Sequence, residues 1–300
     1  MPETFDLDAF LQGKQLQPVM VGKSGAQVYF AGDRFVWKHI RRAHTCEEAV
    51  WDSCVREARM YAEFHNAVEF APKAYQIEQT QQTVSVLLAR GRMLRRDALD
   101  APMLARIMDL LVRIHHYPPP DFLEKPKPYV PPEADLQNTW IEGWESVLAE
   151  HPGVFDQSAV QWIAQHFIEV NLAAAARPFR LVHGDFHIEN LLILPDGRLA
   201  ACDWQSAGIG DPAGDLSFFR SRLSGDGVAL DERTLLCAYC EAAARAGYRE
   251  DAQALARAIA LANVNTSFAF WHAYLHGADT ERVARIFEKM VGDMHMLLAH

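Results

Sequence analysis

The stretch Leu181–Asp203, which reads LVHGDFHIENLLILPDGRLAACD, constrains the fold of this 300-residue chain more than any other. Two apolar runs in it flank the segment Pro195-Asp196-Gly197-Arg198, and an Asp-Gly pair between apolar runs is a strong signal for a β-hairpin. If this pair forms a two-residue turn, Asn190 lies opposite Asp203, with Cβ atoms roughly 5 Å apart. An amide oxygen and a carboxylate at that separation can share a hard cation such as Mg²⁺.

Pro195 leaves a second register open for this hairpin. Proline followed by Asp-Gly also suits a type I turn with a bulge. The resulting one-residue slip would make Asn190 and Asp203 diagonal neighbours instead of direct partners.

Length and composition predict an enzyme of two lobes or domains. Half of the 300 residues are hydrophobic, which is enough for a large core. We place the boundary after Arg90, so that the domains are residues 1–90 and 91–300. No apolar run approaches the roughly 18 residues of a membrane span, and residues 1–12 lack the basic start and apolar centre of a signal peptide. We therefore expect a cytoplasmic protein without a membrane partner.

The net charge of −10 is distributed unevenly along the chain. Residues 1–90 carry 10 Lys and Arg against 11 Asp and Glu, or −1, and residues 91–300 carry 19 against 28, or −9. An acidic second domain argues against a nucleic-acid partner. Its charge either favours cationic or metal-bound ligands through the long-range field or serves only to keep the protein soluble.

The five cysteines show no disulfide framework. An odd number of cysteines, spread through a long chain, indicates reduced thiols. Cys237 and Cys240 form a lone CxxC in a stretch with helical spacing, which favours buried cysteine over a zinc or redox site.

The first domain is predicted to be a sheet with one main helix. Residues 27–30 and 34–38 have the composition of strands around a Gly-Asp turn. The turn before them, residues 21–26, contains Ser24 and Gly25. Its backbone amides could cover phosphates, although most such turns are only connections.

A capping box of Thr45 and Glu48 predicts a helix that runs to about His65. Glu57 lies on the apolar face of that helix, and a buried carboxylate needs a partner. Lys38 of the preceding strand supplies one. The pair is either a structural ion pair or a device that holds the lysine in place to meet phosphate.

The second domain is predicted to be mostly helical, with amphipathic segments at residues 100–115, 136–150, 156–175, 231–246, 250–276 and 280–298. The proline-rich segment Tyr117–Pro132 must be extended, either as a rigid loop beside the substrate site or as a peptide ligand for another protein. Trp140 and Trp144 share one helix face, where they pack in the core or line a ligand pocket.

Asp185, Asn190 and Asp203 form the chemical centre of the sequence. Two carboxylates and an amide suit phosphoryl transfer, which needs positioning and charge neutralisation by a metal. Asp185 lies in the polar loop and is free to accept a proton from an attacking hydroxyl, whereas Asn190 and Asp203 flank the hairpin and are better placed for a metal.

Two other classes of protein compete with this interpretation. His183, Asp185 and His187 alternate like the ligands of a metal-dependent phosphoesterase or other hydrolase, but no further His/Asp cluster has ligand spacing. A nucleotide-binding pseudoenzyme of kinase fold is the third possibility, and the intact set of polar residues argues against it.

The block His183–Leu192, HGDFHIENLL, followed by Asp203-Trp204 and by Gly210–Leu216, GDPAGDL, resembles the aminoglycoside phosphotransferase and choline kinase-like family, relatives of the protein kinases. The resemblance runs from about Gln17 to the C-terminus. It implies an α+β, bilobal protein-kinase-like fold, with a small N-terminal antiparallel-sheet lobe containing one main helix and a larger, mostly helical C-terminal lobe. It also implies a small-molecule kinase that moves the γ-phosphoryl group of ATP or GTP to an alcohol, with Mg²⁺ as cofactor.

The resemblance further implies roles for individual residues. Asp185 would be the catalytic base, and Asn190 and Asp203 would hold Mg²⁺. His183 and Asp215 would support the loop by hydrogen bonds.

For the nucleotide, the resemblance implies that Lys38 meets the α- and β-phosphates and that Glu57 orients Lys38. Ser24 and Gly25 would lie over the phosphates. The segment Leu88 to Gly91 would be the hinge whose backbone reads the base.

Two positions depart from the family pattern. Gln205 stands where the family often has glutamate after the Asp-Trp pair, and Glu189 replaces a small residue before the loop asparagine. Neither departure removes a role that is essential to transfer.

The implied partners are a nucleotide and a small-molecule alcohol, and the protein is expected to be a monomer or homodimer. An acidic helical domain suits a polycationic aminoglycoside, and the tryptophan and tyrosine content suits a quaternary amine such as choline. Sugars, macrolides, nucleosides and amino-acid alcohols stay open.

Overall fold

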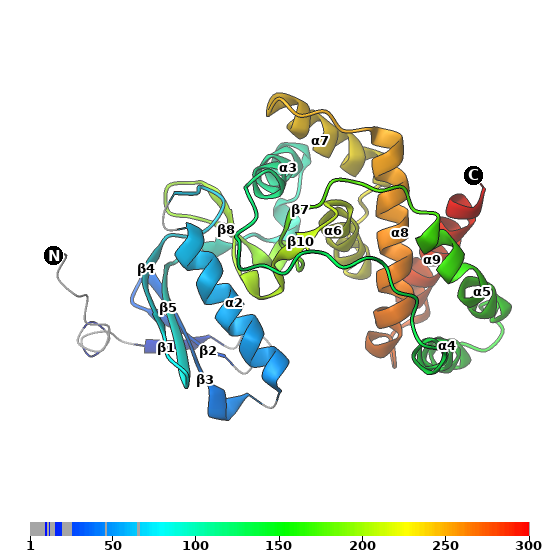
Figure 1. Ribbon diagram of the computed structural model, residues 1–300, viewed down its shortest axis with the longest axis horizontal. Coiled ribbons are helices and arrows are strands. Elements are labelled where there is room, and N and C mark those ends of the chain that lie inside the picture. The colour runs from blue at the N-terminus through cyan, green and yellow to red at the C-terminus, as the bar shows by residue number, and fades with distance from the viewer. Residues whose placement is uncertain are drawn as a thin grey trace. The chain divides into compact units, whose positions relative to one another are not determined.

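The structure, a computed structural model, describes residues 10, 12, 16–19, 26–45, 47–64 and 67–299. The chain forms two compact units (Figure 1). Unit 1 contains residues 1–99, 118–123 and 183–208, and unit 2 contains residues 100–117, 124–182 and 209–300. Because neither unit is a continuous stretch of chain, the division into domains 1–90 and 91–300 stays a prediction.

Unit 1 is built on an antiparallel sheet of five strands in the order β1-β2-β3-β5-β4. The strands are β1 (Leu16–Val19), β2 (Gln27–Ala31), β3 (Phe35–Arg41), β4 (Ala74–Gln79) and β5 (Thr83–Ala89). In this register Lys38 of the central strand β3 pairs with Val28 on one side and Val86 on the other. The predicted N-terminal antiparallel sheet is confirmed.

Helix α2 (Glu48–Phe64) covers one face of this sheet (Figure 1). Its buried face carries Trp51, Cys54, Glu57, Ala58, Met60, Tyr61 and Phe64, which confirms the predicted position of Glu57 on the apolar face. The predicted capping box is wrong, because the Thr45 hydroxyl donates to the Arg42 carbonyl oxygen at 2.6 Å and the helix begins only at Glu48. The predicted end of the helix at His65 lies outside the described residues.

The hairpin of β8 (Leu191–Ile193) and β9 (Leu199–Ala201) joins β6 (Arg92–Met93) in a three-stranded sheet of unit 1. Leu191 pairs with Ala201, so the register is one residue away from that of a two-residue turn. The two-residue turn is therefore wrong and the bulged alternative is confirmed. The reason is local: Pro195 suits the second position of a type I turn, and Gly197, at φ +81°, supplies the left-handed residue of the bulge.

Unit 2 is mostly helical, as predicted. Its helices are α3 (Ala101–His115), α4 (Ala134–Ala149), α5 (Ser158–Leu172), α6 (Ala213–Gly225), α7 (Glu232–Arg245), α8 (Ala252–Phe270) and α9 (Thr280–Leu298). Strands β7 (Arg180–Val182) and β10 (Gly208–Gly210) form a two-stranded sheet. An aspartate side chain caps the start of α3, α7, α8 and α9 by accepting backbone N–H groups.

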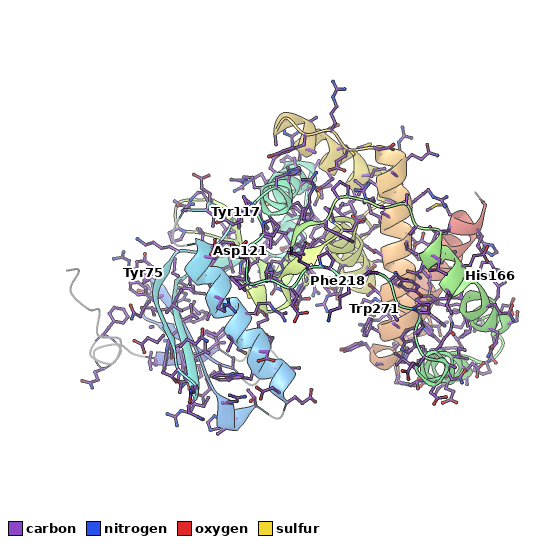
Figure 2. The ribbon with its side chains drawn as sticks, viewed as in Figure 1. Tyr75, Tyr117, Asp121, His166, Phe218 and Trp271 are labelled. Atoms are coloured by element: carbon purple, nitrogen blue, oxygen red, sulfur yellow. The ribbon has the colours of Figure 1, made fainter. Side chains whose placement is uncertain are left out.

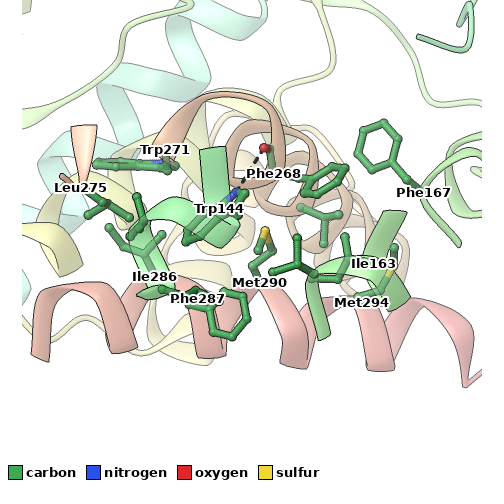
Figure 3. Packing of buried hydrophobic residues seen from close by; sticks show 14 of the residues in the cluster. Trp144, Ile163, Phe167, Phe268, Trp271, Leu275, Ile286, Phe287, Met290 and Met294 are labelled. Carbon is green, nitrogen blue, oxygen red and sulfur yellow. Dashed lines mark hydrogen bonds between the residues drawn. The ribbon is translucent and has the colours of Figure 1, made fainter. Parts of the chain in front are cut away.

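The core of unit 2 is centred on Trp144 of α4 (Figure 3). This side chain is fully buried, and its indole N–H donates to the carbonyl oxygens of Ser267 and Phe268 at 3.1 and 3.2 Å. Trp140 packs its ring against Phe268, and Trp271, labelled in Figures 2 and 3, belongs to the same cluster. The core interpretation of the two predicted tryptophans is therefore correct.

Among the described residues, no helix combines the length and the hydrophobicity needed to cross a membrane. The four cysteines in this part of the chain, Cys54, Cys202, Cys237 and Cys240, are all free thiols. The expectation of reduced cysteines holds for them. The expectation that Cys237 and Cys240 are buried is wrong, because Cys237 is exposed and Cys240 is half-buried on α7.

Candidate active site

The structure brings together Lys38, Glu57 and Asp203, which lie far apart in the sequence but all belong to unit 1. The Lys38 ammonium lies 2.5 Å from Glu57 Oε2 and 3.0 Å from Asp203 Oδ1. The side chain of Glu57 is 4% exposed and that of Lys38 is 16% exposed, whereas that of Asp203 is 38% exposed. The lysine is therefore held from the buried side by one carboxylate and from the open side by the other.

Each member of this trio is positioned by its own element. Lys38 projects from the middle of the sheet, and Glu57 lies on the buried face of α2. Asp203 follows β9 in the left-handed conformation, with φ 65° and ψ 64°. It is the one residue other than glycine with a positive φ in the described ranges. Such a conformation costs energy for aspartate and persists only where the surroundings hold it.

The electrostatics keep Lys38 charged. Burial by itself would lower the pKa of Lys38, but the carboxylates of Glu57 and Asp203 outweigh burial, and the pKa lies above its ordinary value. Burial raises the pKa of Glu57, and the Lys38 ammonium opposes that rise. The site therefore holds an ammonium group ready to meet an anion.

The loop that follows β7 carries Asp185. The Asn190 amide group donates to the Asp185 backbone oxygen at 2.9 Å and to its Oδ2 at 3.1 Å, and His187 Nε2 lies 3.5 Å from the same Oδ2. Burial favours the protonated carboxyl, but His187, His183 and Asn190 outweigh it and hold the pKa of Asp185 below its ordinary value. Asp185 is therefore ionised at neutral pH and can accept a proton or a hydrogen bond.

His183 is fully buried and supports this loop. Its Nδ1 accepts from the Asp185 backbone N–H at 3.4 Å, so Nε2 carries the ring proton and donates to the Cys202 carbonyl oxygen at 3.0 Å. Both ring nitrogens are thus engaged with the backbone. This arrangement fits the predicted supporting role and not a metal ligand.

Gly184 explains why the loop needs glycine after His183. Its φ is +78°, and a Cβ built on it would lie 2.9 Å from the carbonyl carbon of Ser206 and closer still to the carbonyl oxygen. Only glycine allows the loop to approach the Ser206 backbone this closely.

Asn190 and Asp203 have the chemistry of a magnesium site. Asn190 uses its amide nitrogen on Asp185, so its side-chain oxygen is left for a cation, and Asp203 uses Oδ1 on Lys38. A carboxylate and an amide oxygen suit Mg²⁺, which takes oxygen ligands. Because the Asn190 carbonyl accepts from the Cys202 N–H at 2.9 Å, Asn190 and Asp203 are diagonal neighbours, as the bulged register predicts.

A cavity of about 790 Å³ lies beside these residues, within unit 1. Its polar lining includes Lys38, Glu57, Asn190 and Asp203, and its apolar lining includes Val28, Val36, Leu88 and Leu192. Gly91 also lines it, and a Cβ there would lie 2.8 Å from the Cβ of Leu192. The remaining predicted nucleotide residues, Ser24 and Gly25, lie outside the described residues.

The predicted hinge contributes Leu88 and Gly91 to the cavity, but part of its backbone is already engaged. The Ala89 N–H donates to the Lys73 carbonyl oxygen and the Arg90 N–H to the Arg34 carbonyl oxygen, each at 2.8 Å. The base of a nucleotide would have to form hydrogen bonds with other backbone groups of this segment.

Sequence reasoning missed several residues of the cavity. The Arg90 guanidinium stacks over Phe30 at 3.7 Å and donates to the Gly32 carbonyl oxygen at 3.1 Å, and both side chains line the cavity. Tyr61, from the buried face of α2, also lines it. These placements depend on strand register and helix packing, for which the local sequence carries no signal.

Unit 2 contains Asp215, the other predicted support. It is buried, and its Oδ2 lies 3.2 Å from His115 Nε2, while His115 Nδ1 lies 2.8 Å from the Tyr239 hydroxyl. The predicted hydrogen bond from Asp215 to the loop stays a prediction.

The hydrolase alternative finds little support in this geometry. In the part of the chain that the structure describes, no three His, Cys, Asp or Glu side chains come together as a metal-holding group. Burial raises the pKa of the Cys202 thiol beside the site to about 12, so it stays protonated and is a poor nucleophile.

A sequence model of the phosphotransferase enzyme family (APH) matches residues 17–253 of the chain. The chain belongs to this phosphotransferase family. The predicted family is therefore confirmed, and no curated protein matches the chain by sequence.

Solved structures of kinases show the same fold. A choline kinase from Cryptosporidium parvum Iowa II is 10% identical with a TM-score of 0.58, over 94% of this chain and 88% of that one. The ADP-bound aminoglycoside phosphotransferase APH(2″)-Ib is 15% identical with a TM-score of 0.57, over 97% and 96%. The macrolide 2′-phosphotransferase MphH from Brachybacterium faecium is 18% identical with a TM-score of 0.54, over 95% and 98%.

The fold class predicted for this phosphotransferase, α+β and protein-kinase-like, is confirmed by these neighbours. Membership of the family makes the chain a phosphotransferase. The phosphoryl donor, the phosphoryl acceptor and the roles of single residues are proposed below.

Proposed function

We propose that this phosphotransferase moves the γ-phosphoryl group of ATP or GTP to a hydroxyl group of a small molecule. The observation that carries the proposal is the Lys38 ammonium, held between Glu57 and Asp203 at the edge of a cavity large enough for a nucleotide. Phosphoryl transfer needs fixed charges of this kind, because its catalysis consists mainly of positioning and electrostatic stabilisation.

The nucleotide is proposed to enter the 790 Å³ cavity with its base between the apolar side chains of Val28, Val36 and Leu192. Lys38 then contacts the phosphates. Glu57 keeps the lysine directed towards them, since its carboxylate is buried and lies 2.5 Å from the ammonium. Ser24 and Gly25 are proposed to cover the phosphates, and backbone groups of Leu88 and Gly91 to bind the base.

Asn190 and Asp203 are proposed to hold Mg²⁺ through the amide and carboxylate oxygens that their hydrogen bonds leave available. When bound, the ion would neutralise charge on the phosphates and help orient them. Lys38 also neutralises charge on the phosphates, because it supplies a fixed positive charge.

Asp185 is proposed to act as the base. Its carboxylate is ionised at neutral pH and is fixed by Asn190 and His187. It would accept the proton of the acceptor hydroxyl as the oxygen attacks phosphorus, and the nucleoside diphosphate would leave. His183 supports Asp185 by accepting a hydrogen bond from its backbone N–H.

For the acceptor, we propose an alcohol that carries an amine, such as an amino alcohol or an aminoglycoside. The charge of −9 on residues 91–300 supports a cationic acceptor. Structural neighbours named as a choline kinase, an ethanolamine kinase and an aminoglycoside phosphotransferase support the same choice. The cytoplasmic location and the monomeric or dimeric state stay predictions.

The test is a screen of alcohols with ATP and with GTP, with mass spectrometry of the product. We expect ADP or GDP together with an acceptor heavier by one phosphoryl group, and a preference for amine-bearing alcohols over neutral sugars. Release of phosphate from esters without a nucleotide would instead support the hydrolase. Nucleotide binding with no turnover on any alcohol would support the pseudoenzyme.

A further inference from the structure

The residue that follows the Asp-Trp pair, Gln205, contacts α2 in two ways. Its side-chain amide Nε2 lies 3.4 Å from Glu57 Oε2 and 3.5 Å from the Cys54 thiol. Its backbone carbonyl oxygen accepts from Arg56 Nη1 at 2.9 Å. A single residue of the turn η4 (Trp204–Ser206) is thus attached to three residues within one turn of α2.

Trp204 ties the same turn to the far end of α2. The indole is fully buried, donates to the Ala201 carbonyl oxygen at 3.0 Å and meets the Phe64 ring edge-on at 4.8 Å. Asp203, immediately before it, has the left-handed backbone that costs energy. The two residues that follow Asp203 are thus both in contact with α2.

An amide at position 205 suits its neighbour Glu57. Glu57 is buried, and an ionised carboxylate only accepts hydrogen bonds, so the group facing it must donate. The Gln205 amide donates without adding charge. A carboxylate there would place a second negative charge 3.4 Å from Glu57 Oε2, in competition for the one Lys38 ammonium.

Gln205 does not reach the nucleotide cavity itself. Among the described residues, the cavity is lined by Glu57, Lys38 and Asp203, and Gln205 is not part of that lining. Any effect of Gln205 on the nucleotide must therefore pass through Glu57 or through the turn that carries Asp203.

We infer that Gln205 is a positioning residue for nucleotide binding: its amide fixes the Glu57 carboxylate, and through Glu57 the Lys38 ammonium. This inference rests on the proposed function and assigns a role to the position where the chain departs from the family's glutamate. It also implies that glutamate cannot replace Gln205 in this chain without loss, because α2 presents a buried carboxylate to it.

The test measures the affinity of the full-length protein for MgADP by calorimetry. Gln205→Met keeps the length of the side chain and removes the donor, and we expect a roughly 3- to 10-fold weaker affinity, the effect of losing one long hydrogen bond to a charged group. Gln205→Glu should weaken the affinity further, by roughly 30- to 100-fold, because it places a second carboxylate beside Glu57. With ATP and an acceptor, KM for ATP should rise while kcat changes by less than about 3-fold.

Gln76→Met is the matched control. Gln76 on β4 donates to Glu78 Oε1 at the same 3.4 Å but stands outside the cavity lining, so its replacement should leave MgADP affinity unchanged. In a Glu57→Gln background, Gln205→Met should have less than a 2-fold further effect, because its partner is already altered. If Gln205→Met does not fold, Gln205→Asn, whose amide is one methylene shorter, takes its place.

The outcomes separate this inference from the proposed function. A wild-type protein that binds no MgADP would overturn the proposed function and this inference with it. A wild-type protein that binds MgADP, with unchanged affinity in Gln205→Met, would overturn the inference alone. An equal loss with and without Glu57 would also overturn it, since Gln205 would then act through another contact.

Discussion

Replacement of Gly184 by alanine is the sharpest test of how the loop that carries Asp185 is packed. Gly184 has φ +78°, and a Cβ there would collide with the Ser206 carbonyl group. Gly197 has nearly the same φ, +81°, but a Cβ there meets nothing within 4 Å. Alanine at either position therefore has the same unfavourable left-handed backbone, but only alanine at position 184 also collides with a neighbouring group.

The expected magnitudes follow from this difference. Gly197→Ala should lower the free energy of unfolding by about 1–2 kcal/mol, the cost of a left-handed residue with a side chain. Gly184→Ala should add about 1–3 kcal/mol for the forced shift of the Ser206 backbone, to a total of about 2–5 kcal/mol. Because Ser206 is three residues from Asp203, the shift should also lower kcat/KM by roughly 100-fold.

Urea denaturation of both variants, followed by tryptophan fluorescence, measures the stability loss, and an assay with ATP and an acceptor measures the activity. Equal stability losses in the two variants, with kcat/KM of Gly184→Ala within about 3-fold of wild type, would contradict the close packing of the loop against Ser206.

Three further predictions concern other parts of the chain. Trp144→Phe should cost about 1–2 kcal/mol in urea denaturation, because two carbonyl groups lose their shared indole donor; an unchanged midpoint would contradict that bond. Burial, with Arg180 and His115 nearby, lowers the pKa of His116 to about 4 from 6.5. As the pH falls, the unfolded chain therefore binds this proton before the folded chain does. The stability that neutral His116 contributes is complete above about pH 6.5 and is lost as pH falls towards 4. Because the ring is partly exposed, we expect this loss in the free energy of unfolding to be about 1–2 kcal/mol. His116→Asn should flatten the stability profile between pH 4 and 6.5, and an unaltered slope would contradict the shift. Lys38→Met should weaken MgADP binding by roughly 100-fold or more, since it leaves Glu57 and Asp203 without their shared cation; retained affinity would contradict the role of Lys38.

The Lys38–Glu57 pair could be predicted because it breaks a local rule. A carboxylate on the apolar face of a helix is costly unless a cation meets it, and the preceding strand offers only one lysine, Lys38. The structure places the two 2.5 Å apart. A residue that conflicts with its own surroundings is therefore a strong sequence signal.

The hairpin shows where such reasoning stops. Its two strands follow from the apolar runs, but the register depends on whether Pro195 starts a type I turn and Gly197 takes the left-handed position. Both turns are compatible with the same four residues. The choice between direct and diagonal placement of Asn190 and Asp203 is thus made by turn energetics and tertiary contacts.

Other features of the site depend on contacts between distant segments. The left-handed backbone of Asp203 is unexpected for aspartate and is supported by Trp204 packing on Phe64, 140 positions earlier in the chain. The direction of Gln205 towards α2 is likewise a tertiary property. Local propensity and periodicity carry no information about such pairs, so sequence alone left the role of Gln205 undecided.

The central claim, that the loop carboxylate acts as the base of a phosphoryl transfer, is tested most directly by Asp185→Asn. Asp196→Asn is the control, because Asp196 lies in the exposed hairpin turn of the same segment, where its carboxylate accepts hydrogen bonds from the backbone and side chain of Arg198. The assay measures phosphorylated acceptor by mass spectrometry and MgADP affinity by calorimetry.

We expect Asp185→Asn to lower the rate of transfer by roughly 10²- to 10⁴-fold, with MgADP affinity within about 3-fold of wild type and Asp196→Asn fully active. A transfer rate of Asp185→Asn within about 10-fold of wild type would contradict the claim.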